Sequence, residues 1–146
     1  MGSLVSVVSD PARRRVVLED CVALLEAEVD AKSGLSGLAI KGAFKAVKGV
    51  RPGMIAQSMD ALLDDFARAT DPLWQECQAK GQEPRAFFVA RKLDVANALL
   101  AITDGRAQRS PHQTLVKAYQ GLRGVAVDHI GAAMPRLADL FAKHAR

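Results

Sequence analysis

The chain has 146 residues, a formal net charge of +4 and 49% hydrophobic residues, which is the composition of a folded globular protein and excludes a disordered tail. Only 5% of the residues are aromatic, and the apolar content is mostly alanine, valine and leucine, which favours helices over sheets. The positive charge is weaker than that of a dedicated nucleic-acid-binding protein. Two cysteines, Cys21 and Cys77, exclude a disulfide framework, and we expect both to be buried, inert thiols.

Helical periodicity and capping residues predict an all-α fold. Asp10-Pro11 starts a helix that runs to about Ala31, because Asp caps helices and Pro suits the first helical position. Residues 1–9 are expected as a loosely ordered N-terminal segment. Asp71-Pro72 and Ser110-Pro111 repeat the same start, and Arg51-Pro52-Gly53 is a clear break. Further helices are expected over residues 36–49, from after Gly53 to about 70, 72–79, 84–103 and 111–143.

The connections between these helices are short, which suits antiparallel neighbours. We therefore predict a single domain over residues 1–146, an antiparallel helical bundle of about six helices. Glycines and Pro135 leave open whether the segment 111–143 is one helix or two. No stretch of about 18 consecutive apolar residues occurs, so no transmembrane segment is expected. The N-terminal positive charges follow the apolar residues, unlike in a secretory signal, and we expect a cytoplasmic protein.

The segment from Lys32 to Met59 has the most unusual composition, because it contains no acidic residue. On an ideal helix, residues 36–50 sort into three faces. One is an apolar stripe, expected to pack on the core. The second is a basic stripe, and the third consists only of small residues. The apolar stripe is Ile40, Ala43, Phe44 and Val47; the basic stripe is Lys41, Lys45 and Lys48; the small face is Ala39, Gly42, Ala46 and Gly49.

The small face has two interpretations. Glycine inside a helix costs about 0.5–1 kcal/mol relative to alanine, so four small residues at this spacing exceed what packing needs. They indicate either tight packing against a neighbouring helix of the same molecule or a surface for a protein partner or a second copy of the chain.

The basic stripe also has two interpretations. Three aligned lysines can form an ordinary solvated face. With Lys32 and Arg51 they can instead form an anion-binding site for a phospholipid surface or nucleic acid. Nucleic acid has no further support, because aromatic and basic residues are not interleaved.

No pattern indicates catalysis, a metal or a cofactor. His112, His129 and His144 are too far apart for helical metal ligands, and we expect structural roles for all three. Asp60 and Asp64 share a helix face, where Arg68 is expected to pair with Asp64. We therefore predict that the protein is not an enzyme, has no catalytic or metal-binding residue and needs no cofactor.

Two segments together resemble a known family. Residues 31–53, AKSGLSGLAIKGAFKAVKGVRPG, and residues 111–123, PHQTLVKAYQGLR, look like those of small all-helical bacterial proteins known only as a domain of unknown function. The resemblance covers most of the chain and implies a bacterial, cytoplasmic, helical protein. It implies no activity and no site residue, but it suggests that the 31–53 segment belongs to the family pattern.

Three hypotheses of function follow. The leading one is a non-enzymatic helical interaction module that self-associates or docks a protein partner through the small face. The second is binding of an anionic ligand, phospholipid or nucleic acid, by the basic residues 41–51. The third is an enzyme or small-ligand carrier with a pocket inside the bundle, which an apolar cavity near Trp74, Phe87 and Phe88 would favour.

Overall fold

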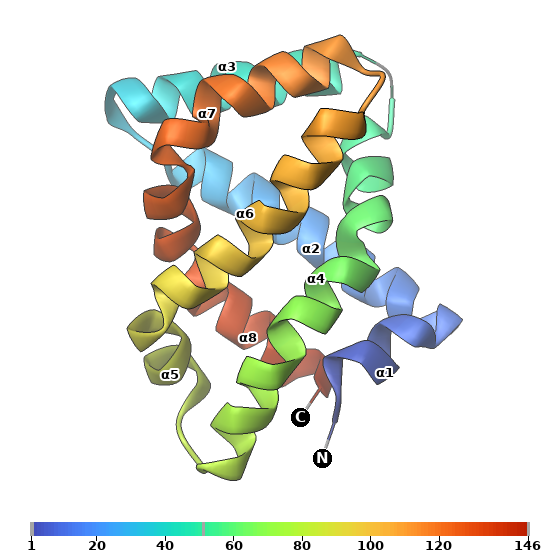
Figure 1. The fold of residues 1–146 in the computed structure, drawn as a ribbon, viewed down its shortest axis with the longest axis vertical. Helices are drawn as coiled ribbons and strands as arrows, with labels where there is room; N and C mark the ends of the chain where they lie inside the picture. The colour runs from blue at the N-terminus through green and yellow to red at the C-terminus, as the bar shows by residue number, and fades with distance from the viewer. Residues whose placement is uncertain (1, 51, 146) are drawn as a thin grey trace.

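A computed structural model of the chain describes residues 2–50 and 52–145, and these residues form helices and no strand (Figure 1). The all-α class is confirmed, but the described residues form eight helices where about six were predicted. The helices are α1 (Leu4–Ser9), α2 (Pro11–Ala31), α3 (Gly34–Lys48), α4 (Met54–Ala79), α5 (Pro84–Ala90), α6 (Lys92–Arg109), α7 (Gln113–Ala132) and α8 (Met134–Ala145).

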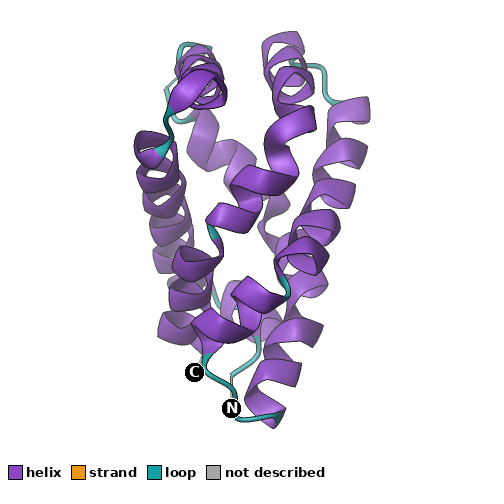
Figure 2. Cartoon of the chain, turned by 90° about the vertical axis from the view of Figure 1, so that its left-hand side faces the viewer, coloured by secondary structure: helices purple, strands orange, loops and turns teal. Residues whose placement is uncertain are grey.

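The helices pack into two groups, one at each end of the molecule. At the upper end of Figure 1, α3 and α7 lie side by side and pack on each other. At the lower end, α5 packs on α8 and α1 packs on α4, while α6 runs diagonally through the middle toward α7. Figure 2 shows from the side that short loops join the helices and that both chain termini lie at the lower end. The two ends differ in how fully side chains fill the space between the helices.

The hydrophobic core lies at the lower end, around an aromatic cluster. The ring centroids of Trp74 and Phe141 are 6.0 Å apart, and Phe88 lies 5.2 Å from both Phe87 and Phe141. These three contacts are edge-to-face, a geometry that adds about 0.5–1.5 kcal/mol per pair to simple burial. An apolar cavity near Trp74, Phe87 and Phe88 would have favoured a ligand pocket there, but Phe88 contacts the other two rings.

The N-terminal segment is a helix and part of this core, contrary to the expectation of loose order. Leu4, Val7 and Val8 are buried in the core cluster. The Asp71 carboxylate accepts hydrogen bonds from the Leu4 backbone N–H at 2.9 Å and from the Ser3 hydroxyl at 3.0 Å. Asp71 thereby accepts hydrogen bonds from a backbone and a side-chain donor at the start of α1. The sequence alone did not indicate this contact between Asp71 and α1.

The same contact explains why Asp71-Pro72 does not begin a helix. α4 continues through Pro72, although proline has no N–H and removes one hydrogen bond from the helix interior. The Asp71 carboxylate binds donors at the start of α1 and does not cap the turn of α4 that follows Asp71. Trp74 and Cys77, one and two turns further along α4, are buried in the core. Burial of these side chains offsets the lost hydrogen bond.

The predicted helix over residues 84–103 is divided in two, and the segment 111–143, for which one helix or two was left open, forms two. Arg91, with φ −106° and ψ 22°, separates α5 from α6, and its guanidinium pairs with Asp94 at 2.6 Å and with Glu76. Ala133 separates α7 from α8, and Pro135 takes the second position of α8, where its missing N–H costs little. The change of direction at Arg91 allows α5 to pack on α8 while α6 packs on α7.

We expect Leu4→Ala to lower the free energy of unfolding by about 2–5 kcal/mol, because the side chain is buried in the core. Leu35→Ala is the matched control, since Leu35 is 89% exposed, and it should change stability by less than about 0.5 kcal/mol. Denaturant unfolding of both variants measures the difference. Equally small effects would show that α1 is not anchored.

Candidate functional site

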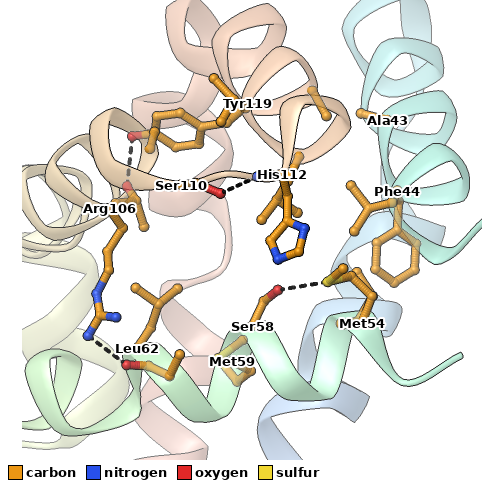
Figure 3. A pocket seen from close by; sticks show the side chains of 18 of the residues that line it. Ala43, Phe44, Met54, Ser58, Met59, Leu62, Arg106, Ser110, His112 and Tyr119 are labelled. Atoms are coloured by element: carbon orange, nitrogen blue, oxygen red, sulfur yellow. Dashed lines mark hydrogen bonds between the residues drawn. The ribbon is translucent and has the colours of Figure 1, made fainter. Parts of the chain in front are cut away.

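A partly enclosed cavity of about 590 Å³ lies between α3, α4, α6 and α7 at the upper end of the molecule (Figure 3). α2 contributes Leu25 and Val29 to its wall. The volume is within the range of about 300–1,000 Å³ that small-molecule sites occupy. The cavity is therefore large enough for a ligand, and it lies away from the aromatic cluster.

The apolar stripe of α3 faces this cavity. All four of its residues, Ile40, Ala43, Phe44 and Val47, line the cavity wall, and none belongs to the core cluster. Val47 is buried, but the stripe as a whole faces the cavity, so the expected packing on the core is found only in part. Side chains that face a gap lose part of the dispersion attraction that packed neighbours would provide. The stripe gains that attraction only if another molecule fills the space.

α7 covers the other side of the cavity. Its apolar residues Leu115, Val116, Tyr119 and Leu122 all line the wall. None of the 20 residues of α7 is buried, although an amphipathic helix in a packed protein normally buries its apolar stripe. Together α3 and α7 cover the cavity at the upper end of the molecule, while Ile130, near the end of α7, packs against the core cluster.

His112 projects into the cavity from the connection between α6 and α7. Figure 3 shows its ring directed toward Ser58 and Met54 of α4. The ring does not cap α7, and it has no hydrogen-bond partner within the described part of the chain. The Ser58 hydroxyl donates only a weak bond to the Met54 sulfur at 3.7 Å. Two polar groups thus face the cavity with hydrogen-bonding capacity left over.

Sequence reasoning missed His112 as a cavity residue. Ser110-Pro111 was predicted to start this helix, but α7 begins at Gln113 and His112 takes the N-cap position. The missing signal was tertiary, because the residue faces Ser58 and Met54 only once α4 and α7 are placed side by side.

Tyr119 is held against the cavity wall by a polar network between α6 and α7. Its hydroxyl lies 2.7 Å from the Thr103 hydroxyl and donates to Asp104, while Arg123 donates to the same carboxylate at 2.9 Å. Burial and then the Asp104 contact raise the pKa of Tyr119. Hydrogen bonds from Arg123 and Tyr119 lower the pKa of Asp104. The network fixes α7 on α6, and its polar groups form their hydrogen bonds with one another.

Two arginines line the cavity, and they differ in the hydrogen bonds and ion pairs that they form. Arg106 donates to the Ala61 carbonyl at 2.8 Å and to Asp65 at 3.1 Å, and so joins α6 to α4. Arg109 is exposed, and no ion pair engages it in residues 2–50 or 52–145. No aspartate or glutamate is among the described residues that line the cavity. The fixed charge of the wall is therefore positive.

The small face of α3 points away from the cavity. Ala39, Gly42, Ala46 and Gly49 are all exposed, and a Cβ added at Gly42 would meet nothing within 4 Å. Tight packing inside the molecule is therefore the wrong interpretation of this face. Docking of a partner or a second copy stays a prediction.

The five basic residues of the predicted anion site do not form one set. Lys41, Lys45 and Lys48 are exposed, and Lys48 lies 5.3 Å from the centre of the Phe44 ring. Lys32 is instead committed to Glu28, with 3.1 Å between its ammonium and the carboxylate. Arg51 lies outside the described residues. Binding of anionic lipid or nucleic acid stays a prediction that rests on the three exposed lysines.

The Glu28 carboxylate explains why Lys32 leaves the basic stripe. Glu28 is only 8% exposed and also pairs with Arg136 of α8. A buried carboxylate needs such partners, because removing one leaves an uncompensated charge. Lys32 therefore serves the junction of α2 and α8 and is not available to a ligand.

The remaining titratable groups have structural roles. Asp60 and Asp64 both bind Arg14 of α2, at 3.0 Å and 2.7 Å. Arg68 pairs with Asp65, so the expected pair with Asp64 is wrong. Burial raises the pKa of the Cys21 thiol to about 11, which keeps it protonated and unreactive at neutral pH.

The described residues 2–50 and 52–145 hold no group of three or more side chains that could bind a metal ion. Within the same residues, no helix is both long enough and apolar enough to cross a membrane.

Comparison with known proteins places the chain in a family. The family of unknown function DUF6918 matches residues 4–145, which is nearly the whole chain. The chain belongs to DUF6918. No curated protein and no solved structure matches it. The family brings no activity to this DUF6918 protein, so its function has to be argued from the geometry of the cavity.

The geometry of the DUF6918 cavity suits holding a molecule. The wall is mostly apolar on α3, α4 and α7; the side chains of His112 and Arg109 make no hydrogen bond or ion pair within the described residues, and Ser58 makes only the weak bond to Met54. Apolar walls with a few placed polar groups are the usual composition of a small-molecule site.

We expect Asp104→Asn to destabilise the protein at pH 7, and the difference from the unmodified chain to shrink below about pH 4. The pKa of Asp104 is lowered in the folded state, so its stabilising contribution is present above the ordinary aspartate pKa and is lost as the pH falls. Denaturant unfolding at several pH values measures this. A difference that stays constant down to pH 2 would contradict the role of the carboxylate charge.

Proposed function

We propose that this DUF6918 protein binds a small, mostly apolar molecule in the cavity under α3 and α7. One observation carries the proposal: apolar side chains of both helices line an unfilled space of about 590 Å³, and no residue of either helix belongs to the buried core cluster. Apolar surface in contact with water costs about 25 cal/mol per Å². A ligand that covers these walls recovers that free energy, and the recovered free energy drives its binding.

In this proposal the ligand enters the cavity by a movement of α3. None of its residues belongs to the core cluster, so moving it does not disturb the packed end of the molecule. Gly34 starts the helix with φ 73°, and Gly53 follows it with φ 78°, a left-handed backbone that favours glycine. In our proposal α3 shifts on these two connections to admit the ligand and then covers it.

The test fills the cavity and compares the two faces of one helix. Ala43→Phe places a ring in the cavity wall, whereas Ala39→Phe places the same ring on the exposed face of α3. With dodecanol as the probe at about 100 times its Kd, binding should raise Tm by about 5–10 °C, since that occupancy adds about 2.7 kcal/mol. Ala43→Phe should lose this shift and Ala39→Phe should keep it.

Thermal unfolding with and without dodecanol, together with calorimetric titration, measures both variants. The proposal fails if the unmodified chain binds no neutral apolar probe. It also fails if Ala43→Phe binds as well as Ala39→Phe, because the ligand would then lie elsewhere.

A second candidate function is docking of a second copy of the chain, or of a protein partner, on the outer face of α3. Leu35 is 89% exposed and Leu38 is 67% exposed. At 100° per residue both fall on the same side of the helix as the small face. This continuous exposed strip of leucines and small residues supports close approach of another helix. It lies on a different face of α3 from the one that lines the cavity, so the two functions do not exclude each other.

For self-association, light scattering after size exclusion should show a mass that rises with concentration, and Gly42→Leu should abolish the rise. A side chain at Gly42 meets nothing within 4 Å, so this variant should fold normally. Gly42→Ala should raise stability by about 0.5–1 kcal/mol. Gly37→Ala is the contrasting control and should be destabilising, because its Cβ would lie 2.8 Å from the Lys32 carbonyl carbon. A strict monomer at all concentrations would contradict self-association.

A further inference from the structure

We infer that the molecule bound in the cavity is a single-chain amphiphile with an anionic head group, which lies at the cavity mouth between Arg109 and His112. This inference rests on the proposed function and adds the chemical class of the ligand. It is carried by the distribution of charge and unengaged polar groups around the cavity.

The charge of the wall favours an anion over a cation or a neutral polar group. The charged side chains among the described lining residues are Arg106 and Arg109, and no aspartate or glutamate is among those residues. Arg106 already donates to the Ala61 carbonyl and to Asp65. Arg109 is exposed and engaged in no described ion pair, so its guanidinium is available for a ligand. A guanidinium with five fixed N–H donors suits a carboxylate or phosphate.

The start of α7 adds donors at the same place. Arg109 is the last residue of α6, and His112 is the N-cap residue of α7. Both therefore lie at the short connection between these two helices. The side chain of His112 does not cap α7, which leaves the first backbone N–H groups of that helix without a side-chain acceptor. The positive end of the helix dipole therefore adds to the charge of Arg109.

Two hydroxyl groups complete the mouth. The Ser110 oxygen accepts a bond from the His112 backbone N–H at 3.2 Å, which leaves its own hydrogen free to donate to a ligand. Ser58 faces His112 across the cavity, as Figure 3 shows, and donates only to the Met54 sulfur. The hydroxyl hydrogen available to a head group is therefore that of Ser110, on the α6–α7 side of the mouth.

The rest of the cavity determines the other half of the ligand. Away from the connection between α6 and α7, the wall consists of aliphatic and aromatic side chains such as Ile40, Phe44, Leu62 and Leu122. A head group there would lose its hydration without gaining partners, which is costly for any charge. The head group therefore lies at the mouth, and an apolar chain extends between α3 and α7.

The test compares head groups on one chain length, by calorimetric titration of the full chain with monomeric probes. Dodecanoate should bind about tenfold more tightly than dodecanol, and dodecyltrimethylammonium should bind most weakly, since a charge-assisted hydrogen bond contributes at about this level. Dodecyl phosphate, titrated in parallel, shows whether the mouth prefers a carboxylate or a phosphate. Affinity for the anionic probes should fall as salt is raised, while affinity for dodecanol should not.

The double variant Arg109→Gln with His112→Asn identifies the residues. It should reduce dodecanoate affinity about tenfold and dodecanol affinity by much less, so that the two probes bind about equally. Arg15→Gln is the matched control, because Arg15 is an exposed cation of α2 outside the cavity, and it should change neither probe.

The outcomes separate this inference from the proposed function. Equal affinity of the unmodified chain for dodecanoate, dodecyl phosphate and dodecanol overturns the anionic head group and leaves the apolar cavity proposal in place. Binding of no probe overturns both. A double variant that loses dodecanol as well as dodecanoate overturns the role of Arg109 and His112 in recognising the head group.

Discussion

The aromatic cluster at the lower end of the molecule is the constraint on which the rest of the structure depends. Complete burial of Trp74 draws α4 against α5 and α8, where Phe88 and Phe141 contact its ring. The indole N–H has no hydrogen-bond partner in the described chain, which costs about 1–3 kcal/mol. Burying a tryptophan contributes about 4–6 kcal/mol, so packing wins over the unsatisfied donor.

Because the large side chains gather at one end, the other end is held together by polar contacts. Arg106 joins α6 to α4, and Asp104 joins α6 to α7 through Tyr119 and Arg123. Glu28 ties the end of α2 to α8 through Arg136. Such contacts fix where the helices cross without filling the space between them. They position α7 over a cavity, while no residue of α3 belongs to the core cluster.

The fold class followed from local signals, and the helix boundaries followed only in part. Asp10-Pro11 begins a helix as predicted, because the cap and the proline act within one turn. Asp71-Pro72 carries the same local signal and lies inside α4, because Asp71 binds donors of Ser3 and Leu4 that are distant in sequence. Local capping energies of about 1 kcal/mol are easily exceeded by burial of a core helix, so identical motifs have different outcomes.

The sequence by itself determined that the chain is helical and that α3 has an apolar, a basic and a small-residue face, because helical periodicity depends only on residue spacing. Which surroundings each face meets was decided by the tertiary structure. The apolar face of α3 meets a cavity, the small face meets solvent, and Lys32 is withdrawn from the basic residues by Glu28. His112 became part of the site for the same reason. A helix pattern states which side chains point together, but only the packing of distant helices decides whether they point at core, at solvent or at an open space.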